Sequence, residues 1–238
     1  MNELEIFGGI GLEVTVADVS RQIRESAPGP LSVRINSPGG SVFDGLAIAS
    51  MLRRRGDVTA IVEGIAASAA SVIAIGAARV VMAPGAFLMI HNPWTLAMGE
   101  SSDLRKEADV LDSIAGELAK LYADASGGKL SVEEARAMMD DETWLTADQA
   151  IDSGLAHAIE GKSKPKAAID GARYGYHNIP KEIMQMTTNT DPAPKAGLLD
   201  RIMASLGNGS EAMAAKDAEL SSVRAELTEA SAALAQAA

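Results

Sequence analysis

Hydrophobic and polar positions follow two different periods along the first part of the chain. Alternation with a period of two, at Leu4 and Ile6 and again from Leu31 to Ile35, predicts short strands. Further strands are expected at Val58 to Val62, where Gly64 should end the strand, and at Val80 to Met82, Phe87 to Ile90 and Leu155 to Ile159.

Apolar residues spaced by three or four positions predict helices between these strands. One helix should begin at Thr15, and two later helices should begin at capping boxes that open with Ser131 and Thr146. Others are expected from Phe43 to Met51, from Ser68 to Ala77, and from about Ser102 to Ala125. This alternation predicts an α/β fold in which right-handed βαβ units form a largely parallel sheet covered by helices.

The pattern divides the chain into three regions. Residues 1–160 should form one body, and residues 161–210 are rich in Lys, Pro, Thr, Asn and Gly, which is typical of a flexible linker. From residue 211 to residue 238 the chain is expected to be helical again. Met213, Leu220, Leu227 and Leu234 are spaced by seven, so this tail should be a short coiled-coil helix, with a generic oligomerising helix or a frayed helix as the alternatives.

Composition narrows the possible functions. The formal net charge is −11, which disfavours binding to nucleic-acid phosphates and to anionic lipid. The chain has no cysteine, so neither a disulfide nor a thiol nucleophile is available. The N-terminus does not resemble a signal peptide, and the longest apolar stretch, Ile65 to Ala78, is too short to span a membrane. We therefore expect a cytoplasmic protein with no nucleic-acid or membrane partner.

Ser68 is the first candidate for chemistry. It lies between a strand and a helix of small residues, where unpaired backbone N–H groups can stabilise a developing oxyanion. A serine nucleophile also needs a neighbouring base. The alternative is that Ser68 only caps the helix. Ser71 is a rival nucleophile, but one turn into the helix its hydroxyl should bond a backbone carbonyl.

His91 is the candidate base, because it follows the strand Phe87 to Ile90 and active sites gather at the carboxyl ends of strands. Its alternative role is that of a hydrogen-bonded loop histidine.

Two further motifs could complete such a site. The turn Ser37-Pro38-Gly39-Gly40 could supply an oxyanion donor or be an ordinary turn. Asp140, Asp141 and Glu142 include a possible acid to orient the histidine, or form a solvated loop.

Four motifs occur in an order that resembles the ClpP peptidase family. They are Ile35-Asn36-Ser37-Pro38-Gly39-Gly40, Gly64-Ile65-Ala66-Ala67-Ser68, Met89-Ile90-His91-Asn92-Pro93, and Trp144-Leu145-Thr146-Ala147 with Ala150 and Gly154-Leu155. The resemblance extends from about Leu4 to Ile159.

The resemblance implies a crotonase-like fold and a Ser-His-Asp peptidase that acts inside a homo-oligomeric ring. Ser68 matches the nucleophile, His91 the base, and Gly40 and Ala69 the residues whose N–H groups form the oxyanion hole. The helix from Ser102 to Ala125 matches the handle helix that helps rings stack. No cofactor and no metal are implied.

Two positions depart from the family pattern. Glu142 stands where the family has its catalytic aspartate, so Glu142 is expected to serve as the acid, with Asp141 as the alternative. The N-terminal segment that engages an ATPase in the family has no counterpart here, which argues against an unfoldase partner.

The sequence looks most similar to the ClpP-like head maturation proteases of tailed phages. This resemblance uses the curtailed N-terminus, the run from Phe43 to Ile48, and the C-terminal extension. It implies scaffold, coat and portal-type head proteins as substrates, and a location inside the procapsid in the host cytoplasm.

Three other functions would each account for part of the pattern. A signal-peptide peptidase relative would use a Ser-Lys pair, but no lysine lies between Met1 and Ala97. A crotonase-type acyl-CoA enzyme would use the same oxyanion donors without a nucleophilic serine. A catalytically weak scaffold or structural protein would keep the fold and the helical tail.

Overall fold

The computed structural model describes residues 2–161, 174–181 and 183. Its strands are β1 (Glu3–Phe7), β2 (Leu31–Ser37), β3 (Val58–Ala67), β4 (Arg79–Met82), β5 (Phe87–Ile90), β6 (Thr143–Thr146) and β7 (Ala158–Ile159). Its helices are α1 (Val16–Glu25), α2 (Val42–Arg55), α3 (Ala69–Ile75), α4 (Ser101–Ala125), α5 (Val132–Asp140) and α6 (Ala147–Asp152). The expected tail, residues 211–238, lies outside the described residues, as does most of the expected linker.

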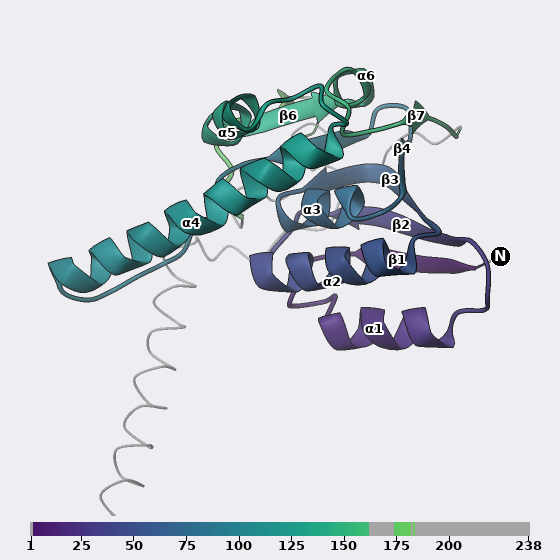
Figure 1. The fold of residues 1–238 in the computed structure, drawn as a ribbon, viewed down its shortest axis with the longest axis horizontal. Coiled ribbons are helices and arrows are strands. Elements are labelled where there is room, and N and C mark those ends of the chain that lie inside the picture. The colour runs from purple at the N-terminus through teal and green to yellow at the C-terminus, as the bar shows by residue number, and fades with distance from the viewer. Residues whose placement is uncertain (1, 162–173, 182, 184–238) are drawn as a thin grey trace, which may run out of the picture. The chain divides into compact units, whose positions relative to one another are not determined.

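The strands form one sheet of seven strands in which β1, β2, β3, β4 and β7 are neighbours in that order. All of these pairs are parallel, and β5 pairs in parallel with β3. Among the strands of the described residues, only β5 and β6 run antiparallel. The largely parallel α/β fold expected from the sequence is therefore confirmed, and α1, α2 and α3 lie along one side of the sheet (Figure 1).

Strand β3 is longer than the sequence indicates, because Gly64 lies inside it and does not end it. The first part of β3 pairs with β4 from Thr59 to Val62, and its last part pairs with β5 from Ile65 to Ala67. The prediction that Gly64 breaks the strand was wrong because the strand changes partner here and still remains hydrogen-bonded. This exchange brings β5 beside the end of β3, where the candidate site lies.

The caps that the sequence predicts are present. Thr15 caps α1, and both Ser131 and Thr146 form complete capping boxes at the starts of α5 and α6. Strand β7 has two residues, Ala158 and Ile159, and is shorter than expected. Within the described residues, the structure has no helix that is both long enough and apolar enough to cross a membrane.

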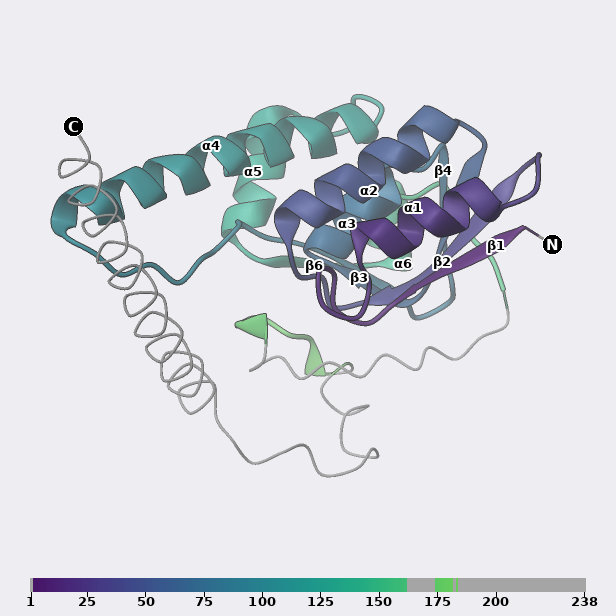
Figure 2. The same cartoon turned by 90° about the horizontal axis from the view of Figure 1, so that it is seen from below.

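Apolar side chains pack on both faces of β3. Ala66 belongs to the large core under the helices, whereas Ile65 and Ala67 belong to a smaller cluster with Met89. This smaller cluster also contains Tyr176 and Ile183, so residues 174–181 and 183, which we call the strap, cover the opposite face (green in Figure 2). The sequence assigns these residues to a flexible linker, but the structure packs them on the body.

Candidate active site

Ser68 lies at the junction between β3 and α3 in an unusual backbone conformation. Its φ is 54° and its ψ is −123°, a combination that non-glycine residues rarely adopt. Although Ser68 is the N-cap of α3, its side chain makes no capping hydrogen bond. Its Oγ atom instead lies 2.8 Å from Nε2 of His91. The Ser68 hydroxyl therefore does not have the capping role that the sequence offered as the alternative.

His91 reaches Ser68 because the ends of β3 and β5 are joined. The backbone N–H of Ser68 donates to the carbonyl of Met89 at 2.9 Å, so the pairing of β3 with β5 continues one residue beyond the end of β3.

The protonation of His91 suits a base. If Nε2 accepts the serine proton, Nδ1 must carry the other ring proton. Burial lowers the pKa of His91, and the negative charge of Glu142 opposes this effect by raising the pKa. The imidazole is therefore kept neutral and able to accept a proton.

Ser71, the rival nucleophile, is fully buried and its hydroxyl is already engaged. Its Oγ lies 2.6 Å from the carbonyl oxygen of Ser68 and 2.8 Å from the hydroxyl of Tyr122. The bond to a carbonyl one turn back is the one expected from the sequence. This hydrogen bonding supports the backbone of Ser68 and leaves Ser71 without access to a substrate.

The glycine turn lies directly against Ser68. A Cβ atom added to Gly39 would be 2.8 Å from Cβ of Ser68 and 2.6 Å from the carbonyl oxygen of Ala67, so only glycine fits there. Gly40 and Ala69 are the two expected oxyanion donors. In the part of the chain that the structure describes, neither residue donates its N–H in a hydrogen bond. Both donors are thus available to bind an oxygen atom near Ser68.

Glu142 and Asp141 lie in different surroundings. Asp141 is exposed, whereas Glu142 is 8% exposed and has a positive φ of 48°. The carboxylate of Glu142 accepts hydrogen bonds from the N–H groups of His177 and Asn178 at 2.8–2.9 Å. It also accepts one from Nε1 of Trp144 at 3.2 Å. Among the described residues there is no hydrogen bond between Glu142 and His91, so the influence of Glu142 on the imidazole is electrostatic.

The strap contributes a residue that the sequence analysis did not select. The Tyr176 ring meets the His91 ring edge-on, with centroids 5.3 Å apart, and meets the Trp144 ring in a similar way at 5.7 Å. Its hydroxyl donates to the carbonyl of Pro38, just before the two glycines. One signal was available, because Tyr174 and Tyr176 are two of only three tyrosines in the chain and lie together in an otherwise polar region.

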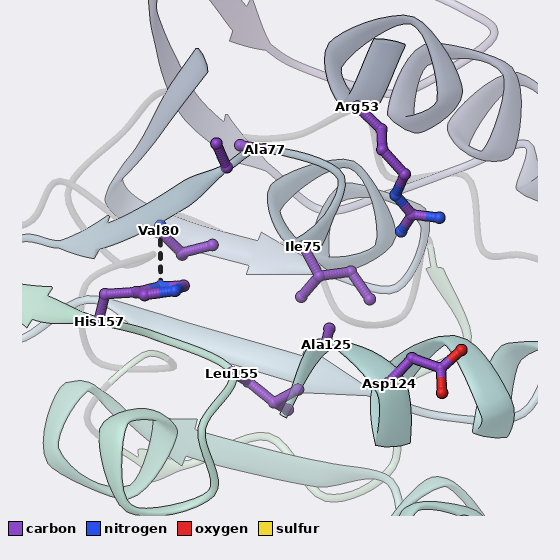
Figure 3. A pocket seen from close by; sticks show the side chains of 9 residues that line it. Arg53, Ile75, Ala77, Val80, Asp124, Ala125, Leu155 and His157 are labelled. Atoms are coloured by element: carbon purple, nitrogen blue, oxygen red, sulfur yellow. Dashed lines mark hydrogen bonds between the residues drawn. The ribbon is translucent and has the colours of Figure 1, made fainter. Parts of the chain in front are cut away.

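The other two histidines have no comparable surroundings. Nδ1 of His157 accepts the backbone N–H of Val80 at 3.1 Å, beside a pocket that Arg53 and Asp124 also line (Figure 3). His177 contributes its backbone N–H to Glu142, as described above. The described residues contain no cluster of His, Asp and Glu side chains that could hold a metal ion.

Comparisons with known proteins show which family this chain resembles. The model of the family described as Clp protease matches residues 21–163. The ATP-dependent Clp protease proteolytic subunit of Bacteroides fragilis is 37% identical over 132 residues, which are 54% of this chain and 63% of that protein. The subunit of the same name from Ligilactobacillus salivarius is 36% identical over 138 residues, which are 57% of this chain and 68% of that protein. The chain thus spans less than two thirds of the Bacteroides relative.

A solved structure gives the same result for the fold. A mutant of ClpP1 from Listeria monocytogenes superimposes with a TM-score of 0.60 and 27% identity, covering 68% of this chain and 92% of that one. The matched residues contain Ser68, His91 and Glu142, whereas the strap begins beyond residue 163. The family match, the sequence relatives and the shared fold agree that this chain belongs to the Clp protease family.

Proposed function

We propose that the chain is a serine endopeptidase that forms an acyl-enzyme on Ser68. The observation that carries this proposal is the 2.8 Å contact between Ser68 Oγ and His91 Nε2, made by a serine whose side chain caps no helix. A hydroxyl is a weak nucleophile until a base accepts its proton, and a neutral imidazole at hydrogen-bonding distance is such a base.

The geometry supports the following sequence of steps. As Ser68 Oγ attacks the peptide carbonyl, its proton moves to Nε2 of His91. The N–H groups of Gly40 and Ala69 stabilise the oxyanion, and His91 then donates its proton to the departing amine. Water, deprotonated by His91, then attacks the ester, and His91 returns that proton to Ser68 Oγ as the bond to the new carboxyl end breaks. We assign Glu142 the role of stabilising the imidazolium that forms twice in this cycle, because it is the buried carboxylate whose charge raises the pKa of His91.

Digestion of an unfolded protein tests this activity without knowledge of the preferred bond. We expect the full chain to release fluorescence from a denatured, self-quenched fluorescent protein, and we expect the Ser68→Ala variant to release none. Equal release by both proteins would show that a contaminant or another residue cuts the substrate. No release by folded wild-type protein would contradict the proposed activity.

We also propose that the chain forms a homo-oligomeric ring. The support comes from exposed apolar side chains on α4 and on the loop before it. Leu104 and Val110 on α4 are 44% and 50% exposed, and Trp94, Leu96 and Met98 are exposed nearby. Burying such residues against another copy would be favourable. Sedimentation velocity should show a large assembly that Leu104→Glu weakens, and a wild-type monomer at high concentration would contradict this proposal.

For the substrates we propose scaffold, coat and portal-type head proteins, cleaved inside a phage procapsid. The support is the resemblance of the run from Phe43 to Ile48 to phage head maturation proteases, together with the heptad repeat expected at residues 211–238, which would act as a scaffold-like tail after a linker. Particles assembled with wild-type or Ser68→Ala protein should differ in the N-termini of their head proteins. Identical termini would reject this substrate class.

A further inference from the structure

The strap contacts the candidate site although it lies outside the part of the chain that matches the family. The family match ends at residue 163, and the strap comprises residues 174–181 and 183. Ile183 is fully buried and Tyr176 nearly so, in a cluster that includes Ala67, the residue before Ser68. The strap is therefore packed against the strand end that carries the nucleophile.

The backbone of the strap holds the carboxylate of Glu142. The N–H of His177 lies 2.9 Å from both carboxylate oxygens, and the N–H of Asn178 lies 2.8 Å from one of them. A buried carboxylate is costly unless donors surround it, and here the strap supplies two of the three donors that reach it. The side-chain amide of Asn178 additionally donates to the carbonyl of Asp141 at 2.9 Å. Together these bonds tie the strap to the loop that carries Glu142.

The side chain of Tyr176 joins the other parts of the site. Its ring edge contacts the His91 ring, and its hydroxyl is bound to the Pro38 carbonyl in the glycine turn. Through these two contacts, Tyr176 restricts the rotation of the imidazole ring and the movement of the turn that carries Gly40. Burial raises the pKa of Tyr176, so the phenol stays protonated and remains a donor.

We propose that the strap is a positioning element of the active site, in which Tyr176 orients His91 and the glycine turn while the His177 and Asn178 N–H groups orient Glu142. This inference rests on the proposed peptidase function. It assigns no chemical step to the strap, whose residues act through their contacts with Ser68, His91, the glycine turn and Glu142. Removing its contacts should slow acylation of Ser68.

A strap that merely blocks the site would behave in the opposite way. Tyr176 lies within reach of Ser68 and Pro38, so a blocking segment could occupy the same place. Loosening a blocking strap would speed acylation, whereas loosening a positioning strap slows it. The two hydrogen bonds to Glu142 favour positioning, because blocking a substrate does not require holding the acid.

The test measures the rate at which a fluorophosphonate labels Ser68 in the full chain. His177→Pro removes the N–H that touches both oxygens of Glu142. Lys181→Pro is the matched control, since it places a proline in the same segment at an exposed residue that does not bind Glu142. We expect His177→Pro to be labelled about tenfold to a hundredfold more slowly, the usual effect of misplacing a catalytic group, and Lys181→Pro to be labelled at the wild-type rate.

Tyr176→Phe is a second, milder test, because it removes one oxygen atom and keeps the ring against His91. We expect its labelling to slow severalfold and that of Tyr176→Ala to slow further. A pH profile separates positioning from general loss of packing. The titratable groups around His91 are Glu142 and Tyr176, with Asp140 bound to the adjacent Asn92. If His177→Pro displaces Glu142, the pKa of His91 falls and the acid midpoint of labelling moves to lower pH.

The outcomes separate this inference from the proposed function. If folded wild-type protein is not labelled on Ser68, the peptidase proposal fails, and the inference fails with it. If the wild type is labelled, and both His177→Pro and Tyr176→Phe are labelled at the wild-type rate, the strap has no positioning role. The peptidase proposal then stands. Faster labelling of either variant would show that the strap blocks the site. If His177→Pro is labelled more slowly but the acid midpoint of its pH profile stays at the wild-type value, the proposal that the strap positions Glu142 is wrong.

Discussion

The two halves of the candidate site are built in different ways. Ser68 and His91 are held by the sheet itself, because β3 and β5 end side by side and their backbones are hydrogen-bonded. Glu142 lies in a loop with a positive φ, and the segment that holds its carboxylate follows more than thirty residues later, at residues 177 and 178. The comparison shows that the sheet alone brings Ser68 and His91 together, whereas Glu142 is held by a segment outside the family match.

The largest expected effect comes from the sheet-held half. His91→Ala removes the proton acceptor of Ser68, and we expect the hydrolysis rate to fall by about 10⁵-fold to 10⁶-fold, as is found for bases of serine peptidases. Stopped assays of peptide bond cleavage at equal concentrations of folded protein measure this ratio. A loss below tenfold would mean that His91 is not the base.

A substitution of Glu142, the residue held by the strap, should reduce the hydrolysis rate less than a substitution of His91. Glu142→Gln removes a charge that acts on His91 without a direct hydrogen bond, so we expect a rate loss of about 10²-fold to 10⁴-fold, no greater than that seen for triad acids. Asp141→Asn is the control, because Asp141 is exposed, whereas Glu142 is the buried carboxylate whose charge raises the pKa of His91. A larger loss in Asp141→Asn than in Glu142→Gln would reverse the assignment of the acid.

The pH dependence compares the two halves within one protein. Burial lowers the pKa of His91 from its ordinary value of 6.5, and Glu142 partly opposes this. The base is active when neutral, so activity should be lost as the pH falls through a midpoint below 6.5. Glu142→Gln removes the opposing charge and should move this midpoint lower still. A midpoint above 6.5 in the wild type would show that attraction to a carboxylate outweighs burial.

The smallest effect concerns the local support of the acid. Ser131 caps α5, which precedes Glu142, through a complete capping box. Ser131→Ala should lower the free energy of unfolding by about 1 kcal/mol, the usual cost of losing such a cap, as measured by urea denaturation. We expect the hydrolysis rate to stay unchanged, because Glu142 is held by the strap. A large rate loss would show that α5 positions the acid instead.

Much of the sheet-held half follows from the sequence. The alternation at β1 and β2, the capping boxes and the motif around Ser68 each predict what the structure contains, because local periodicity and local hydrogen bonding determine them. Gly64 misled the prediction, since glycine usually weakens a strand but here lies where β3 exchanges partners.

The strap could not be predicted in the same way. Its contacts with Glu142 are made by backbone N–H groups, which every residue except proline carries and which leave no mark in the sequence. Its packing depends on single side chains, Tyr176 and Ile183, that form no periodic pattern. The choice of Glu142 rests on the family resemblance, which gives no indication of the segment that holds its carboxylate.

The central claim is that His91 activates Ser68, and mass spectrometric mapping of fluorophosphonate adducts on the full chain tests it most directly. The account predicts one adduct, on Ser68, which is absent when His91 is replaced by alanine. An adduct on another residue such as the buried Ser71, equal labelling of Ser68 without His91, or no adduct on folded and assembled protein would contradict it.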